Sequence, residues 1–256
     1  MLKKDRLDQI IKLLQSNGVV EVSQLCRMFD VTEMTVRRDL DELAEKSLII
    51  RTHGGAVLPE DNILVEQPYE VRLLQNSVEK QAIAKLAVDF IEDGQKIYLD
   101  SGTTTYFLAR ALNNSHRLIV ITNAINIAAE LNTRTNITVI QIGGELRKNA
   151  LSCVGYFAEE MIKQLKVDIA FLGVSSLGPK GELYSGSMAE VGIKRAILES
   201  SRKTIVLANS NKIGNEEFVY IGNLKNVDCL ITDSNNPDPL LEKYREMGVQ
   251  VKVAEI

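Results

Sequence analysis

The sequence predicts an α/β protein in which a small helical unit with a β-hairpin precedes a larger unit built on a mostly parallel sheet. Apolar residues recur at helical spacing over the first 58 residues and end in a glycine-rich hairpin pattern. From residue 76 onward, short apolar runs alternate with helical patterns, an arrangement typical of a parallel sheet buried between helices. We therefore expect a first domain over 1–58, a connector with partial structure over 59–75, and a second domain over 76–256.

The composition is that of an ordinary globular protein and narrows the possible chemistry. The chain has 256 residues, 45% hydrophobic and 25% charged, with a net charge of −4. No apolar run approaches the ~18 residues that span a bilayer, and the N-terminus lacks the pattern of a signal peptide. The three cysteines are widely spaced, and only two histidines are present. We expect a cytoplasmic protein with reduced cysteines, no membrane partner, no metal and no cofactor.

The first domain begins with two helices. Leu7, Ile10, Ile11 and Leu14 lie at helical spacing, and the Asn17-Gly18 pair is a helix terminator. A shorter helix follows, with Val22, Leu25, Cys26 and Phe29 on its apolar face. Asp30 then stands in a tight turn, because Asp tolerates a left-handed backbone better than most residues.

A third helix follows, with Thr32 as its N-cap and Val36, Leu40, Leu43 and Ala44 on its buried face. Met34, Thr35 and Arg38 lie opposite that face, and Arg37 lies at its margin. The acids Asp39, Asp41, Glu42 and Glu45 come later in the helix and can point away from a ligand. These features favour a helix-turn-helix that presents its third helix to DNA; the alternative is a solvated helix face of mixed charge. The charges give little guidance, since residues 1–58 hold nine basic and nine acidic side chains.

A hairpin with His53-Gly54-Gly55 at its turn follows the third helix. A hairpin in that place is a wing, from which Arg51 and His53 could reach the phosphate backbone. The run "VSQLCRMFDVTEMTVRRDLDELAEKSLIIRTHGGAVL" resembles the N-terminal domain of the DeoR family of bacterial transcriptional regulators. Asp30 stands where relatives often have glycine. The resemblance implies the following DNA contacts: Ser23, Thr32, Glu33, Met34, Thr35, Arg37, Arg38, Arg51 and His53.

The second domain is predicted to place polar residues at the carboxyl ends of its strands, where parallel sheets bind ligands. We expect strands over 96–99, 118–122, 137–142, 168–173, 204–208 and 227–232. The first is followed by Asp100, Ser101, Gly102, Thr103, Thr104 and Thr105; other strand ends carry Thr122, Asn123, Gly143, Gly144, Arg147 and Lys212.

The 101–105 segment has two interpretations. Backbone N–H groups at a helix N-terminus, with hydroxyl side chains and a glycine, suit a single phosphate. The absence of G-K-[ST] from this loop argues against a nucleotide triphosphate site. The other interpretation is an ordinary capped helix in which the hydroxyls make only local hydrogen bonds.

The resemblance extends to this domain through "LDSGTTT", "VITNAINIAAEL", "IGGELRKNALSCVG" and "EVGIKRAILESSRKTIVLANSNKIG". It implies a fold similar to ribose-5-phosphate isomerase and a sensor for a phosphorylated sugar. It adds Glu190 and Lys194, which could instead form only a helix salt bridge. Asn209 replaces an aspartate that is frequent in relatives, and Ser187 stands near the place of another.

The sequence suggests three candidate functions. The first is a transcriptional regulator, most simply a repressor, whose DNA affinity falls when a phosphorylated sugar binds. The second is a sugar-phosphate isomerase with an appended DNA-binding domain. Proton transfer needs a positioned base, and Asp100, Glu145 and Glu190 form no clear acid–base pair, so we expect no catalytic residues. An RNA-binding or scaffolding protein fits poorly, because only 5% of residues are aromatic. A single reader domain binds DNA weakly, so we expect a homo-oligomer, a dimer or a tetramer, on double-stranded operator DNA.

Overall fold

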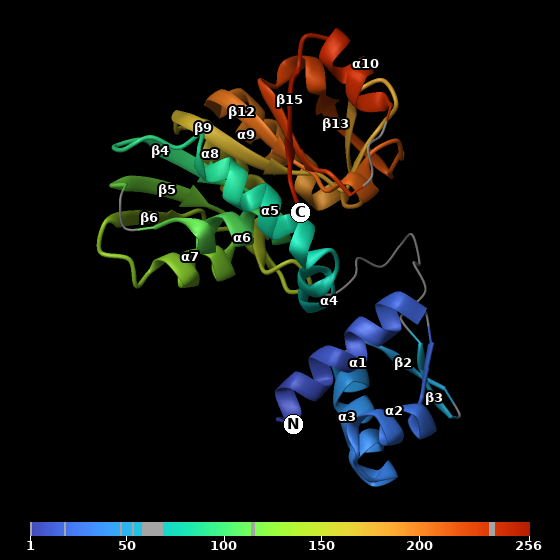
Figure 1. The fold of residues 1–256 in the computed structure, drawn as a ribbon. Coiled ribbons are helices and arrows are strands. Elements are labelled where there is room, and N and C mark those ends of the chain that lie inside the picture. Colours follow the sequence, from blue (N-terminus) through green and yellow to red (C-terminus); the bar gives the residue numbers. More distant parts are fainter. Residues whose placement is uncertain are drawn as a thin grey trace. The chain divides into compact units, whose positions relative to one another are not determined.

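The computed structural model describes residues 2–17, 19–46, 48–52, 54–57, 69–113, 116–235 and 239–256. The chain divides into two compact units, Met1–Ser77 and Val78–Ile256 (Figure 1). Within the described residues, no helix is both long enough and apolar enough to cross a membrane.

The first unit is a helical domain with a small sheet. Its helices are α1 (Lys3–Asn17), α2 (Val22–Phe29), α3 (Glu33–Glu45) and α4 (Tyr69–Leu74), and its strands are β1 (Val19–Glu21), β2 (Ile50–Arg51) and β3 (Gly55–Val57). The hairpin β2–β3 is the predicted wing, and β1 pairs with β3 to give the order β1-β3-β2. We did not expect β1, because three residues between two helices carry no periodic signal.

Three local predictions for this unit are confirmed. Asp30 has a left-handed backbone with φ 51°, and the Thr32 side chain caps α3 by accepting from the Thr35 N–H at 3.3 Å. The core includes Ile10, Leu25 and Leu40. Val71 of α4 joins this core, so part of the segment expected to be a connector is helical and packed against the first unit.

One residue of α3 differs from its predicted place. We expected Asp39 among the acids that point away, yet it is 1% exposed. Arg6 of α1 donates to its two carboxylate oxygens at 2.5 and 3.1 Å. The pair joins α1 to α3, and the buried carboxylate raises the pKa of Arg6 through its hydrogen bond, against the effect of burial.

The second unit is built on a seven-stranded sheet in which every neighbouring pair of strands is parallel. The strand order is β15-β14-β12-β9-β4-β5-β6. The bounds are β4 (Lys96–Leu99), β5 (Leu118–Thr122), β6 (Ile137–Gln141), β9 (Val167–Gly173), β12 (Ser201–Leu207), β14 (Cys229–Asp233) and β15 (Gln250–Ala254). Six of the seven were predicted to within about three residues; β15 was not. The α/β fold class is confirmed.

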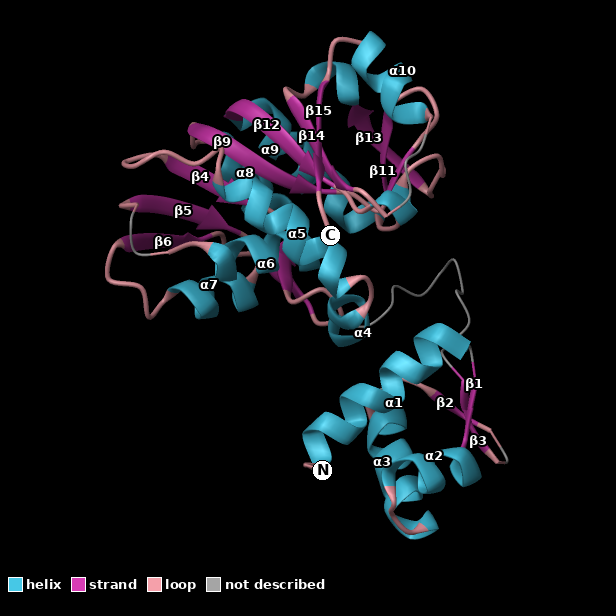
Figure 2. Cartoon of the chain, viewed as in Figure 1, coloured by secondary structure: helices cyan, strands magenta, loops and turns pink. Residues whose placement is uncertain are grey.

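Helices cover the sheet on both faces (Figure 2). They are α5 (Ser77–Val88), α6 (Thr103–Ala111), α7 (Ile125–Leu131), α8 (Tyr156–Lys163), α9 (Met188–Ser200) and α10 (Leu240–Glu246). Figure 1 shows α5 in front of the sheet and α9 behind it. Apolar residues of α8, α9 and α10 share one buried cluster with one face of the sheet, including Ile162, Ile197, Tyr244 and Tyr98.

Two small antiparallel sheets complete the unit. The hairpin of β7 (Glu145–Arg147) and β8 (Ser152–Val154) joins β6 to α8, and a three-stranded sheet has the order β10-β11-β13. Its strands are β10 (Ser176–Leu177), β11 (Glu182–Ser185) and β13 (Val219–Asn223), and two short 3-10 helices are η1 (Ser210–Lys212) and η2 (Leu224–Asn226).

The strand order fixes where the site lies. β4 is the first strand of the sheet, with β5 and β6 added on one side and β9, β12, β14 and β15 on the other. The sheet therefore grows in one direction from β4 to β6 and in the opposite direction from β9 onward. The switch point lies between the neighbouring strands β4 and β9. In open α/β sheets the ligand crevice forms at such a switch point, outside the carboxyl ends of the strands.

Candidate functional site

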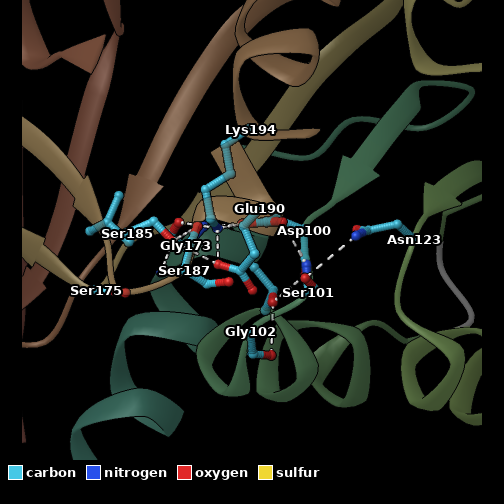
Figure 3. Close-up of polar contacts among 12 residues, drawn as sticks. Asp100, Ser101, Gly102, Asn123, Gly173, Ser175, Ser185, Ser187, Glu190 and Lys194 are labelled. Atoms are coloured by element: carbon cyan, nitrogen blue, oxygen red, sulfur yellow. Dashed lines mark hydrogen bonds and ion pairs between the residues drawn. The ribbon is translucent and has the colours of Figure 1, made fainter. Parts of the chain in front are cut away.

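Asp100 lies at the switch point and joins the two central strands. It follows β4, is fully buried, and its Oδ2 accepts from the backbone N–H of Gly173, the last residue of β9, at 3.1 Å. Its Oδ1 accepts from the Ser101 N–H at 2.8 Å. The carboxylate thus fixes the start of the 101–105 segment relative to β9 (Figure 3).

Lys194 of α9 neutralises this carboxylate. Its ammonium donates to Asp100 Oδ2 at 2.6 Å and to the Gly173 carbonyl at 2.8 Å, and the two side chains are 4% and 1% exposed. Burial alone lowers the pKa of Lys194, but the attraction of Asp100 and Glu190 outweighs burial and raises that pKa above its ordinary value. Lys194 is therefore a charged lysine that holds the strand ends together.

Glu190, one turn before Lys194, is paired with a different cation. Its Oε1 accepts from Arg147 of the β7–β8 hairpin at 2.6 Å, and its Oε2 accepts from the Ser185 hydroxyl at 3.0 Å. The distance between Glu190 and Lys194 is 3.8 Å, longer than the shortest contact of either with its other partner. The helix salt bridge that the spacing suggested is thus present, but the stronger contacts run across elements.

Two cations and two carboxylates therefore alternate in one buried chain, in the order Arg147, Glu190, Lys194 and Asp100. Figure 3 shows Glu190, Lys194 and Asp100 side by side above the start of α6. Their formal charges cancel, so an entering anion meets a neutral network whose cations already have partners.

The 101–105 segment forms the first turn of α6, with Gly102 as an N-cap that has no side chain to offer. The first helical hydrogen bond is from the Tyr106 N–H to the Gly102 carbonyl. Among the described residues, the backbone N–H groups of Thr103, Thr104 and Thr105 have no acceptor. These donors point out of the helix end, as they do in anion-binding helix termini.

One hydroxyl of this turn caps the helix locally, and two others are available to a phosphate. Thr105 donates to the carbonyl oxygens of Asp100 and Gly102 at 2.5 and 2.9 Å, which is the local capping role. Within the described residues, the hydroxyls of Thr103 and Thr104 make no hydrogen bond, although these residues are only 7% and 4% exposed. Two hydroxyls and three N–H groups therefore remain for a ligand.

The end of β5 supports this turn. Asn123 is 1% exposed; it accepts from the Tyr98 hydroxyl at 3.1 Å and donates to the Cys153 carbonyl at 3.0 Å and to the Ser101 hydroxyl at 3.5 Å. The Thr122 hydroxyl accepts from the Ala124 N–H at 3.0 Å. Asn123 therefore connects the 101–105 segment to the β7–β8 hairpin.

Of the two glycines after β6, Gly144 is required by packing. Gly144 has φ +148°, and a Cβ there would lie 2.5 Å from the Val154 carbonyl oxygen. Glycine at this position lets β7 turn back against β8. A Cβ on Gly143 would have no neighbouring atom within 4 Å, so packing does not require glycine at that position.

The polar residues after β12 make contacts that the sequence did not predict. Lys212 in η1 donates from Nζ to the Val174 carbonyl at 2.5 Å, which places it beside the end of β9. Asn209 is 2% exposed, and its Oδ1 has no partner among the described residues. Ser210 donates from its N–H and hydroxyl to Asp233, a buried carboxylate at the end of β14 that sequence reasoning missed.

Gly173 and Ser185 were also missed. Gly173 contributes only backbone atoms, so its side-chain type carries no signal. Ser185 precedes Glu190 by five residues on a different element, and only the turn between β11 and α9 brings its hydroxyl onto the carboxylate.

In the first unit, the exposed face of α3 carries Met34 and Arg38. Met34 is 64% exposed, and no described residue pairs with the exposed guanidinium of Arg38. Arg37 is exposed but bound to Glu33 at 2.6 Å, four residues earlier. The hydroxyls of Thr35 and Thr32 form a hydrogen bond with each other at 3.0 Å.

The wing lies beside the first turns of α2 and α3. Arg51 donates to the Gly55 carbonyl at 3.1 Å and pairs with Asp41 at 3.1 Å, so it is held against its own unit. An open hollow of about 800 Å³ is lined by residues that include Ser23, Glu33, Arg37 and Arg51. Four of the expected DNA contacts therefore surround one concave surface. His53, also expected there, lies outside the described residues.

Comparison with known proteins agrees with this architecture. Residues 6–62 match the family model of the DeoR-like helix-turn-helix domain, and residues 75–234 match that of the DeoR C-terminal sensor domain. The glycerol-3-phosphate regulon repressor of Escherichia coli (strain K12) is 34% identical over 253 residues, covering 99% of this chain and all of the relative. An HTH-type transcriptional regulator of Bacillus subtilis (strain 168), YulB, is 36% identical over 98% of this chain and 96% of its own.

Solved structures match this chain more distantly. Ribose 5-phosphate isomerase A from Methanocaldococcus jannaschii aligns with 54% of this chain and 55% of its own, with 20% identity and a TM-score of 0.41.

A winged helix-turn-helix joined to an α/β sensor domain defines a ligand-responsive DNA-binding regulator. The chain belongs to the DeoR family of transcriptional regulators, and the family resemblance found in the sequence is confirmed.

Proposed function

We propose that the protein is a repressor whose affinity for operator DNA falls when a phosphorylated sugar or polyol binds at the carboxyl ends of β4, β5 and β9. The Escherichia coli relative described above is a repressor of a glycerol-3-phosphate regulon, which supports this proposal. A repressor of this kind would act in the cytoplasm, on double-stranded DNA, as a homo-oligomer.

The observation that carries the proposal is the unsatisfied first turn of α6. Three backbone N–H groups and the hydroxyls of Thr103 and Thr104 lie in one helical turn without acceptors among the described residues. A phosphate supplies acceptor oxygens and gains from the helix dipole, and each hydrogen bond to a charged group contributes about 1.5–3 kcal/mol. Gly102 leaves room for its close approach.

The cations of the site would respond to that charge. Arg147 is bound to Glu190 in the structure. An arginine guanidinium can also bind a phosphate through two parallel hydrogen bonds. We infer that a bound phosphate competes with Glu190 for Arg147 and so alters the β7–β8 hairpin. Lys194 stays with Asp100, because separating that pair would leave a buried carboxylate uncompensated.

The same contacts favour a sensor over an isomerase. A general base needs a carboxylate that can take a proton from the substrate. Asp100 accepts two backbone N–H groups and a lysine, and Glu190 accepts an arginine and a serine hydroxyl. Both carboxylates are thus occupied in holding the fold. We propose that the site binds its ligand without converting it.

The DNA side of the proposal rests on α3. Arg38 and Met34 are exposed on the face away from the core, near the helix start, as a major-groove reader requires. We propose that Thr32, Thr35 and Arg37 lie against DNA with them, and that Ser23, Glu33 and Arg51 line the adjoining hollow.

Two variants test the two halves separately. Thr104→Val removes one hydroxyl without changing size, and it should weaken the response of operator binding to glycerol 3-phosphate or another sugar phosphate by about 10- to 150-fold. Thr133→Val, in an exposed turn of the same unit, is the matched control. Operator release that persists unchanged in Thr104→Val would remove the α6 turn from the site.

Arg38→Ala should cost about 1–3 kcal/mol in operator binding, measured by fluorescence anisotropy, if the guanidinium reads a base. Lys12→Ala removes the same charge from an exposed position on α1 and serves as the control. Equal losses in both variants would show that only net charge matters. Turnover of a sugar phosphate during the same incubations would favour the isomerase.

A further inference from the structure

An aromatic pair stands exposed at the start of α8. Tyr156 and Phe157 are 71% and 76% exposed, and their rings meet edge to face at a centroid distance of 5.8 Å. The whole chain has no tryptophan, seven tyrosines and six phenylalanines. Two adjacent exposed rings are therefore a notable share of its aromatic side chains.

Other exposed apolar side chains belong to neighbouring elements. Leu146 of β7 is 47% exposed, Met161 of α8 is 40% exposed, and Met188 at the start of α9 is 66% exposed. We refer to these three residues, Tyr156 and Phe157 as the apolar face. Phe157 and Met161 are four residues apart and so lie on the same side of α8.

Close contacts hold the three elements of the apolar face together. A Cβ on Gly144 would lie 3.1 Å from the Cβ of Ala158, so the start of β7 packs on the first turn of α8. A Cβ on Gly192 would lie 2.1 Å from a carboxylate oxygen of Glu159, so α8 and α9 are in contact at these residues. Arg147 of β7 pairs with Glu190 of α9 at 2.6 Å.

The exposed area is that of a protein interface. An aromatic side chain offers about 200 Å², so the two rings together expose about 300 Å². A standard interface buries about 800 Å² on each partner, of which roughly 450–520 Å² is apolar. The two rings supply more than half of that amount, and the leucine and the two methionines add to it.

The chemistry of the face suits a copy of itself. Beside it on α8, Glu160 and Lys163 form a pair of opposite charges at 2.8 Å, so these two side chains do not repel an identical surface. A two-fold interface requires such self-complementarity. The first 58 residues also carry nine charges of each sign, so one reader domain has little general attraction for DNA and gains from a second copy.

We propose that the apolar face of α8, β7 and α9 is the surface through which two copies of this chain pair. The inference rests on the proposed function for its biological role. The β7–β8 hairpin would also connect the candidate ligand site to this interface. Leu146 adjoins Arg147, and the β7–β8 hairpin is bound to Asn123 through both the N–H and the carbonyl of Cys153. An exchange of partners at Arg147 acts directly on the interface.

The test is the mass of the full chain in solution, measured by size-exclusion chromatography with light scattering. The double variant Tyr156→Ser/Phe157→Ser should have half the mass of the wild-type assembly. Its self-association should weaken at least about 30-fold, as expected for loss of one aromatic hot spot of 2 kcal/mol. Phe157→Glu, which places two carboxylates across the two-fold axis, should act in the same direction.

Phe218→Ser is the matched control, since Phe218 is 64% exposed and lies just before β13 in the same unit. It should keep the wild-type mass. An unchanged mass for both α8 variants, a monomeric wild type, or equal dissociation of Phe218→Ser would each overturn the proposal. Circular dichroism checks that the variants are folded.

A second readout separates this inference from the proposed function. The stabilisation of each protein by glycerol 3-phosphate and other sugar phosphates is measured by thermal shift. Dissociated variants that still bind the ligand support the interface and leave the sensor intact. If no protein binds any sugar phosphate but the masses change as expected, the interface stands and the sensor role fails.

Discussion

Lys194→Met tests whether the buried pair at the switch point holds the second unit together. The change keeps most of the side-chain volume and removes the positive charge. Asp100 then keeps its two backbone donors but loses its cation, while 1% exposed. Loss of one partner of a buried ion pair costs about 3–5 kcal/mol, and neither side chain is exposed enough for solvent to reduce this figure. A unit of this size loses about 2–4 °C of Tm per kcal/mol, so Tm should fall by about 6–20 °C.

The assay is differential scanning calorimetry of the full chain, following the transition of the second unit. Lys163→Met, which removes an exposed lysine 48% accessible to solvent, is the control and should shift Tm by little. The double variant Asp100→Asn/Lys194→Met should recover part of the loss, because no buried charge is left unpaired, although the single amide oxygen can accept from only one of the two backbone N–H groups. A fall in Tm of less than about 2 °C in Lys194→Met would refute the reasoning.

Two further outcomes follow from the contacts above. Asp39→Ala should destabilise the first unit by about 3–5 kcal/mol, because it leaves the Arg6 guanidinium buried without its carboxylate; urea unfolding measures this, and an unchanged midpoint would contradict it. Burial raises the pKa of Cys229 to about 11, so this thiol should stay protonated and unreactive toward a disulfide reagent at pH 8, and its reactivity should rise only as the pH approaches 11. Half-buried Cys26 should react first, and equal rates for the two thiols would argue against this burial.

Much of the fold was predictable because its signals are local. The apolar stripes of α1 to α3, the Thr32 cap and the left-handed turn at Asp30 depend on neighbouring residues, and short parallel strands stand out as apolar runs. The elements that were missed have other causes. The strands β1, β7 and β10 have two or three residues each, which is too few for a period to show.

The candidate site was predictable in its location but not in its contacts. Polar residues after successive strands must meet at one edge of a parallel sheet, so the 101–105 segment, Asn123 and Arg147 could be grouped from the sequence. Which cation neutralises which carboxylate could not. Lys194 and Asp100 are 94 positions apart, and their pairing depends on how α9 lies across the end of β4.

The sequence by itself determined the two-unit plan, the helix-turn-helix with its wing, and the sheet edge that collects polar groups. These features follow from the periodicity of apolar residues and from the direction of parallel strands. Both can be predicted from residues that are close in the sequence. Only the tertiary structure decided that Asp39 is buried against Arg6, that Thr105 caps its helix while Thr103 and Thr104 keep their hydroxyls available, and that two charged pairs close the site. Such choices depend on which distant groups share a low-dielectric interior, where an unpaired charge is costly, and no local pattern records that sharing.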